Sequence, residues 1–238
     1  MTFTILGRDP VTGELGIGIA TYSLAVGATC PRILLGIGVV TSQASTNPAI
    51  GEEIMELIED GLEPSDAFIQ SLANDSHPDY RQVALLTPKG EALVHSGANI
   101  KPVSGHAIGH DCVAVGNFLA NENVLEAMVA GFDKAADDGE VELRLADRII
   151  FTLEAGKNAG GQSSPDGQHL AERSACLLVG APEDRFPINI RVDSSPNAIT
   201  ELRSAYDAYH PMHDYYLQRA ENPTNLPSQT EWAKQLGS

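Results

Sequence analysis

Thr2 is the strongest candidate for a catalytic nucleophile in this sequence. Initiator methionines are generally removed when the next residue is small, so Thr2 can become the first residue and carry a hydroxyl and a free α-amine together. A threonine hydroxyl is a weak nucleophile until a base takes its proton, and an N-terminal amine with a pKa near 8 can be that base. Taken alone the observation favours an ordinary first-strand threonine, because many proteins begin Met-Thr.

Thr21 is expected to lie beside Thr2. Residues 2–8 alternate as a β-strand does, Asp9-Pro10-Val11-Thr12-Gly13 supplies a turn, and a second strand runs from Glu14 to Thr21. Paired positions of such a hairpin add up to about 22 or 23, which puts residue 20 or 21 opposite Thr2. The Thr21 hydroxyl could orient the amine or the nucleophile there, or the residue could be present for its β-propensity alone.

Other chemistry-bearing groups give weaker patterns. His106 and His110 are four residues apart, but glycines in the same stretch argue against a helix, so a zinc hydrolase is only an alternative interpretation. His210, His213 and Asp214 are more typical of a solvated surface or an interface. Neither a G-x-S-x-G elbow nor a phosphate-binding G-x-x-x-x-G-K-[ST] motif occurs. No cofactor and no metal are therefore expected.

The elements that must position these residues follow from periodicity and turn residues. Asn47 is expected to cap a helix that has Pro48 at its first position. Apolar stripes predict helices over 48–61, 64–73, the segments around 125–132 and 145–153, and 196–209. Strands are expected at 2–8, 14–21, 33–42, 82–87, 92–95, 112–115, 174–179 and 188–192.

Grouped strands that alternate with paired helices predict an α+β fold. The expected architecture is a four-layer αββα sandwich, with two antiparallel sheets flanked by helices. Gly16 and Gly18 leave one face of the second strand almost bare, so something must pack closely there, and Gly-rich strand faces are expected to meet inside. The stretch Gly156–Gly167 is expected to be a flexible loop and a candidate lid.

Composition limits the partners. The 238 residues include 15 basic and 32 acidic side chains, a formal net charge of −17, so nucleic acid and anionic membranes are not expected as partners. The chain shows no export signal and no apolar stretch long enough to cross a membrane, which predicts a cytoplasmic location. Cys30, Cys112 and Cys176 lie in apolar surroundings and are expected to be buried, reduced thiols.

Several segments resemble an uncharacterised bacterial family, domain of unknown function 1028, which is assigned to the N-terminal-nucleophile (Ntn) hydrolase superfamily. The similar segments are TFTILGRDPVTGELGIGIAT, AVGATCP, GIGVVTSQASTNP with GEE, RQVALL, GHAIG, AVGNFLA, LEAG with AGG, and RVDSSP with ITELR. They span roughly residues 2–205. The resemblance implies the αββα fold and amide-bond hydrolysis, and it supplies no substrate.

The resemblance also implies roles for individual residues. Thr2 matches the nucleophile and Thr21 the polar residue that closes the second strand. The end of the third strand, Gln43-Ala44-Ser45, corresponds to the place where such enzymes present a backbone N–H as an oxyanion donor. Asn117 could add an amide donor, or could cap a helix that begins at Phe118. The lysine that some members keep near the third strand is missing, and an attached Met1 would leave Thr2 without a free amine.

The sequence therefore predicts an Ntn-type hydrolase that cleaves a small amide substrate with Thr2. The alternative is a catalytically inactive Ntn-fold protein for binding or assembly. Residues 1–205 are expected to form the main domain, and residues 206–238 a C-terminal helix and polar tail packed on the body or on a partner subunit. The aromatic residues Tyr206, Tyr209, Tyr215 and Tyr216 suggest apolar area for a homodimer, or cover for the chain's own body.

Overall fold

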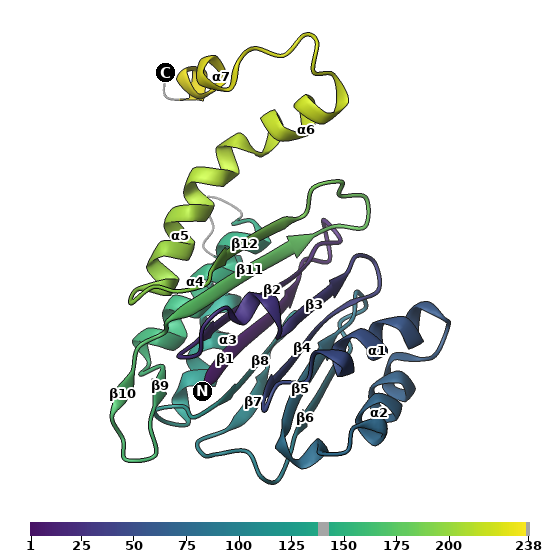
Figure 1. Cartoon of the computed structure of the whole chain (residues 1–238), viewed down its shortest axis with the longest axis vertical. Helices are drawn as coiled ribbons and strands as arrows, with labels where there is room; N and C mark the ends of the chain where they lie inside the picture. Colours follow the sequence, from purple (N-terminus) through teal and green to yellow (C-terminus); the bar gives the residue numbers. More distant parts are fainter. Residues whose placement is uncertain (138–142, 237–238) are drawn as a thin grey trace.

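Two antiparallel sheets form the centre of the protein (Figure 1). The computed structural model describes residues 1–137 and 143–236. The larger sheet has six strands in the order β12-β11-β2-β1-β8-β7. Its strands are β1 (Thr2–Arg8), β2 (Leu15–Thr21), β7 (Gly105–Ile108), β8 (Cys112–Asn117), β11 (Ser174–Gly180) and β12 (Ile188–Val192). The predicted mixture of antiparallel sheets and helices is confirmed.

The smaller sheet has four strands in the order β3-β4-β5-β6. These are β3 (Pro31–Leu34), β4 (Gly38–Ala44), β5 (Arg81–Leu86) and β6 (Ala92–Ser96). The single strand expected over 33–42 is wrong, because the chain turns back between Leu34 and Gly38. Gly36 has a φ of 79° in this turn, which a glycine adopts without strain, and the Ile37 N–H donates to the Leu34 carbonyl over 3.0 Å.

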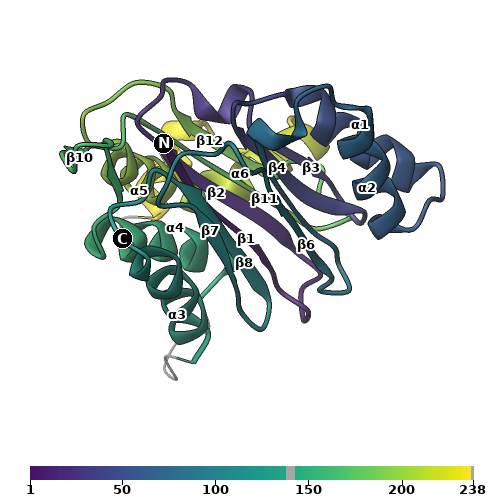
Figure 2. The same ribbon diagram turned by 90° about the horizontal axis from the view of Figure 1, so that it is seen from below.

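Two pairs of helices cover the sheets on different sides (Figure 2). Helices α1 (Pro48–Glu59) and α2 (Pro64–Asn74) pack together beside the smaller sheet, and α3 (Asn123–Asp137) and α4 (Leu145–Asn158) pack together against the larger one. The Asn47 side chain accepts a hydrogen bond from the Ala49 N–H over 3.3 Å, so the predicted cap of α1 is confirmed.

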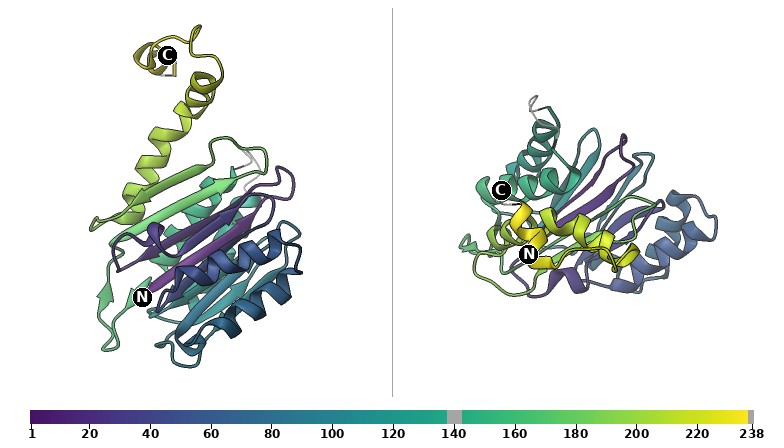
Figure 3. Two further views of the ribbon diagram at one scale, coloured as in Figure 1. Left: turned by 45° about the vertical axis from the view of Figure 1, so that its right-hand side comes forward. Right: turned by 90° about the horizontal axis from the view of Figure 1, so that it is seen from above.

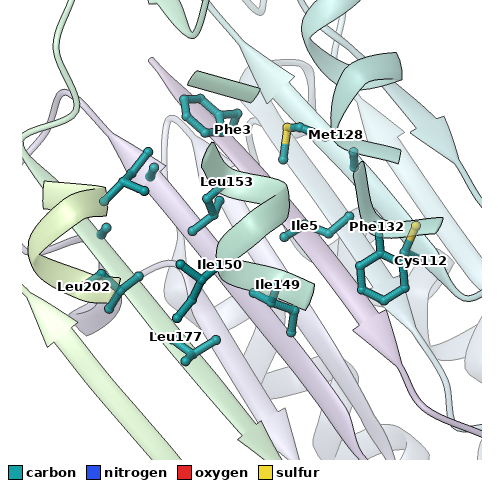
Figure 4. Close-up of a cluster of buried hydrophobic side chains, with 14 of the residues drawn as sticks. Phe3, Ile5, Cys112, Met128, Phe132, Ile149, Ile150, Leu153, Leu177 and Leu202 are labelled. Atoms are coloured by element: carbon teal, nitrogen blue, oxygen red, sulfur yellow. The ribbon is translucent and has the colours of Figure 1, made fainter. Parts of the chain in front are cut away.

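Apolar side chains fill the space between the sheets and the space under α3 and α4. Leu15, Ile17 and Ile19 point from β2 toward the smaller sheet and share a buried cluster with Val39 and Leu86. A second cluster lies beneath α4 on the opposite face of the larger sheet (Figure 4). Both faces of the larger sheet are thus buried.

The glycine face of β2 packs against a helix, which corrects the expectation that Gly-rich faces meet inside. A Cβ built on Gly16 would lie 2.5 Å from Ile149 Cδ1 of α4, and one on Gly18 would collide with Ile149 Cγ2. The missing side chains let α4 approach the strand closely.

The C-terminal segment leaves the body as a helical arm (Figure 3). Helix α5 (Ala198–Tyr209) packs on β11 and β12, the 3₁₀ turn η3 (His210–Met212) joins it to α6 (His213–Glu221), and α7 (Gln229–Leu236) follows. Two other 3₁₀ turns, η1 (Val26–Ala28) and η2 (Pro78–Tyr80), lie in the body of the protein. Tyr206 and Tyr215 are buried, and the Tyr215 and Trp232 rings lie 5.5 Å apart. None of the helices in the described ranges is long and apolar enough to cross a bilayer.

Candidate functional site

Thr2 and Thr21 face each other at one end of the larger sheet. The register pairs Thr2 with Thr21, as the hairpin arithmetic predicts, and their Oγ1 atoms are 3.1 Å apart. The Asp9 N–H donates to the Glu14 carbonyl, and hydrogen-bonded pairs alternate along the ladder, so Thr2 and Thr21 form a non-hydrogen-bonded pair. Side chains are closest in such pairs, which explains the hydroxyl contact.

The hydrogen bonds of Thr21 fix the direction of this contact. The Thr21 hydroxyl donates to the Met1 carbonyl and accepts from the Ser23 N–H over 3.2 Å. A hydroxyl has a single proton, so Thr2 must be the donor in the Thr2–Thr21 bond. While Met1 is attached, Thr21 Oγ1 therefore accepts a hydrogen bond from the Thr2 hydroxyl.

The N-terminal amine lies beside Asn117. The Met1 amine donates to Asn117 Oδ1 over 2.7 Å, and burial lowers its pKa from 8.0 to about 6. The Arg8 N–H donates to the Asp111 carbonyl, so alternation along β1 and β8 makes Thr2 and Asn117 a hydrogen-bonded pair. Asn117 thus contacts the start of the chain with both its side chain and its backbone.

Asn117 is oriented by the buried Gln82 and does not cap a helix. Its Nδ2 donates to Gln82 Oε1 over 3.0 Å, which turns Oδ1 toward the amine. Helix α3 begins only at Asn123, so the interpretation of Asn117 as the cap of a helix at Phe118 is wrong. The residues between them form turns and bends, which a pattern of apolar positions does not reveal.

Gln43 belongs to the same buried network. Its Nε2 donates to Gln82 Oε1 over 2.8 Å, and its Oε1 accepts from the Thr4 hydroxyl over 2.6 Å. Gln82 was missed by the sequence analysis. A glutamine directly before the apolar run VALL was the available signal, because a fully buried amide needs several partners. Gln82 Nε2 reaches the carbonyls of Gly105 and Gly116.

A pocket of about 590 Å³ opens over the N-terminus. Asn117 and Met1 line it together with Ala44 and Ser45 at the end of β4. The remaining lining comes from residues that the sequence analysis did not single out: Tyr80, Ala98, Asn99, Ile100, Lys101, Pro102 and Phe118. The size is that of a small-molecule site. The six predicted site residues are thus at or next to one pocket, although Thr2 is only 6% exposed.

The backbone N–H groups of Ala44 and Ser45, the two candidate oxyanion donors, differ in whether they are already hydrogen-bonded. The Ser45 N–H donates to the Tyr80 carbonyl over 3.1 Å, so this donor is already engaged. Because ladder bonds alternate, the Ala44 N–H points away from β5. Ala44 has a φ of 69° and Phe118 a φ of 54°, so two pocket residues adopt a backbone conformation that costs energy for side chains other than glycine.

The histidine candidates lie in other surroundings. His106 is exposed in β7, and His110 follows this strand, with Nδ1 2.7 Å from Asp111 Oδ2. His210 stacks on Tyr206, and His213 Nε2 is 2.9 Å from the Phe186 carbonyl. Within residues 1–137 and 143–236, no three His, Cys, Asp or Glu side chains are grouped closely enough to hold a metal ion.

The stretch Gly156–Gly167 is more ordered than a flexible loop. It begins in the last turn of α4 and enters a small hairpin of β9 (Gln162–Ser163) and β10 (His169–Leu170). Ser163, Ser164 and Gly167 line a neighbouring pocket of about 270 Å³, which shares Lys101 and Pro102 with the pocket at the N-terminus. The lid remains a prediction.

The cysteines take no part in the site. Cys30, Cys112 and Cys176 are buried free thiols, as predicted. Burial raises the pKa of Cys112 to about 12 and also raises the pKa of Cys176. They lack the thiolate character of a nucleophile.

Residues 2–202 match the family of unknown function DUF1028. A crystal structure of a Silicibacter pomeroyi protein from this family is similar, with 32% identity, a TM-score of 0.76, and coverage of 87% of this chain and 88% of that chain. Two Anbu structures are more distant. The Gly-1 mutant from Hyphomicrobium sp. strain MC1 has 10% identity, a TM-score of 0.38 and coverage of 92% and 100%. Anbu from Yersinia bercovieri has 8% identity, a TM-score of 0.36 and coverage of 95% and 98%. Among curated proteins, none matches this sequence.

Proposed function

The chain belongs to the DUF1028 family of unknown function, and we propose that it is an Ntn-type hydrolase that cleaves a small amide bond with Thr2 after loss of Met1. One observation carries the proposal: Met1 lines a pocket of about 590 Å³, and the next residue is a buried threonine whose hydroxyl contacts Thr21. Removing Met1 would place a hydroxyl and a free amine of the same residue at the floor of that pocket.

The reaction needs few groups. The Thr2 amine takes the hydroxyl proton as Oγ1 attacks the amide carbonyl carbon, and the carbonyl oxygen becomes an oxyanion. The Ala44 N–H is the proposed donor to this oxyanion, a contribution of about 3 kcal/mol in comparable sites. Collapse of the intermediate breaks the C–N bond, and the amine leaves with the proton. Water then hydrolyses the ester on Thr2 through the same base, which releases the acid.

Asn117 and Thr21 are the proposed positioning residues. The Asn117 carbonyl and Oδ1 would both face the amine of Thr2, and burial would keep its pKa low enough for it to act as a base at neutral pH, as burial does for Met1. The Thr21 hydroxyl loses its acceptor when the Met1 carbonyl leaves. It can then donate to Thr2 Oγ1 and stabilise the developing alkoxide.

The finer features of the fold belong to the same proposal. We assign the four-layer αββα arrangement of Ntn hydrolases to residues 1–205, supported by two facing sheets with a helix pair on the outer side of each. The arm formed by residues 206–238 is proposed to pack on a partner subunit of a homodimer in the cytoplasm. Its small helix α7 has no buried residue, which leaves room for such a contact.

A non-catalytic binding module is the second candidate. The contacts of Met1 support it, because the carbonyl and amine of this residue engage Thr21 and Asn117. In that case the pocket would hold a ligand without turning it over.

The two candidates are separated by the state of the N-terminus and by activity. Intact-mass measurement of protein purified from its natural host should show loss of Met1. Processed protein should hydrolyse members of a small-amide panel; Thr2→Ala should abolish this hydrolysis and Thr2→Ser should retain it. Thr224→Ala is the control, because Thr224 lies on the exposed arm. Retained Met1 together with unchanged turnover by Thr2→Ala would eliminate the Ntn mechanism.

A further inference from the structure

Lys101 lines the pocket at the N-terminus and brings a cationic side chain to it. The amine at the start of the chain is also basic, but burial lowers its pKa to about 6, so it carries little charge at neutral pH. Among the described residues that line the pocket, none is acidic. This is unusual in a chain with 32 acidic and 15 basic side chains, whose surface repels anions in general. The pocket is therefore a local exception to the charge of the protein.

Lys101 is held on a connection that links the two sheets. Its segment runs from β6 of the smaller sheet to β7 of the larger one. The Asn99 N–H donates to the Asp79 carbonyl over 2.8 Å, and the Ile100 N–H donates to the Gly97 carbonyl over 3.2 Å. Beyond Lys101, the Val103 carbonyl accepts from the Leu119 N–H over 2.9 Å. The backbone that carries the lysine is anchored on both sides.

Within residues 1–137 and 143–236, no protein group forms a hydrogen bond or an ion pair with the Lys101 ammonium. The other cation near this pocket is already neutralised, since the Arg81 guanidinium binds the Asp75 carboxylate at 2.9 Å. Lys101 is thus the cation whose charge remains available to a bound molecule.

We propose that the pocket selects amides that carry a carboxylate, with Lys101 binding the carboxylate while the amide carbonyl lies at Thr2. This substrate class rests on the proposed function above. The lysine supplies up to three N–H donors for carboxylate oxygens. The volume of about 590 Å³ fits a small acyl amino acid or the half-amide of a diacid. Lys101 is a specificity-determining residue here, because it contacts a part of the substrate that does not react.

Matched pairs of compounds test this proposal. N-acetylglycine with N-acetylglycinamide, and succinamate with succinamide, differ in a single carboxylate that is replaced by a neutral amide. The variants are Lys101→Gln, which removes the charge, and Lys101→Arg, which restores it. Lys89→Gln is the control, because Lys89 is exposed in the turn at the opposite end of β5 and β6.

Binding is measured first, with Thr2→Ala protein as the background so that turnover plays no part. The carboxylates should bind at least about tenfold more tightly than their neutral partners, the value of one charge-assisted hydrogen bond. Lys101→Gln should remove this preference, while Lys101→Arg and Lys89→Gln should keep it. In processed active protein, Lys101→Gln should raise KM for the carboxylate substrate by a similar factor with little change in kcat.

The two proposals can fail separately. Lys101-dependent carboxylate binding without turnover would support the anion site and count against the hydrolase. Equal binding of the charged and neutral partners, no binding of either pair, or a preference that survives Lys101→Gln would overturn the role of Lys101. Turnover of neutral amides alone would leave the hydrolase in place and overturn the substrate class.

Discussion

Replacing Asn117 with Asp is expected to restore an ordinary pKa to the Met1 amine. In the native chain this amine donates to the neutral Asn117 Oδ1 over 2.7 Å, and burial lowers its pKa from 8.0 to about 6. An opposite charge at that distance favours the protonated amine and raises its pKa by about 1–3 units. Asn117→Asp should therefore bring the pKa of the amine back to about 7 or above.

The same shift can be read from stability. The unfolded state holds more protons on this amine than the native state between pH 6 and 8, so the free energy of unfolding should rise with pH over that window. A pKa difference of two units corresponds to about 3 kcal/mol of folding stability, which is absent below pH 6 and fully present above pH 8. In Asn117→Asp this rise should shrink or disappear. The quantity to compare is the increase in the free energy of unfolding between pH 6 and pH 8 within each protein. A loss of stability that the substitution causes equally at both pH values cancels in this difference.

The assay uses protein whose intact mass shows that Met1 is retained. Methionine labelled at Cα reports the titration of the Met1 amine by NMR, and urea unfolding at pH 6 and 8 reports the linked stability. Asn189→Asp is the matched control, because Asn189 is exposed on β12 at the far edge of the sheet. A native amine that titrates near 8, or an Asn117→Asp amine that still titrates near 6, would refute the reasoning.

Three further predictions concern the scaffold. Gly18→Ala would press a Cβ against Ile149 and should lower the free energy of unfolding in urea by about 1–3 kcal/mol. Gly105→Ala should cost much less, because the nearest neighbouring atom lies 3.9 Å from the added Cβ, and equal losses would contradict the packing argument. Asn47→Ala removes the cap of α1 and should lower the free energy of unfolding by about 1 kcal/mol, so an unchanged urea midpoint would speak against the cap. Burial raises the pKa of Cys112 to about 12, so this thiol should not react with a thiol reagent at pH 8 until urea unfolds the chain. Rapid labelling of Cys112 in the native protein would contradict this prediction.

Local signals were enough to predict the first hairpin and the first helix. The turn at residues 9–13 sets the pairing of Thr2 with Thr21, and the Asn47-Pro48 pair marks the start of α1. In both cases the determining residues are neighbours in the sequence. The strand expected over 33–42 failed for the opposite reason, because an uninterrupted apolar pattern concealed a turn that depends on Gly36.

The rest of the site depends on contacts that sequence spacing does not encode. Gln82 reaches Asn117 only because β4 and β5 of one sheet lie over β1 and β8 of the other. Lys101 reaches the pocket because its segment crosses between the sheets. From the sequence, a lysine is missing near the third strand, and glycine-rich strand faces are expected to meet inside. The glycines instead receive α4, and the cation comes from another part of the chain.

Met1 links the two candidate functions more closely than the sequence suggests. Its carbonyl accepts the Thr21 hydroxyl and its amine occupies Asn117 Oδ1, so it satisfies the same two groups that a processed Thr2 would need. A buried polar group left without a partner costs about 1–3 kcal/mol. After loss of Met1, the Thr2 amine and a bound substrate would therefore have to replace its hydrogen bonds to Asn117 and Thr21. The network of Gln82 and Gln43 stays in place in either case, because its bonds do not involve Met1. Removal of one residue, rather than a rearrangement of the fold, would therefore separate a covered binding site from an open catalytic one.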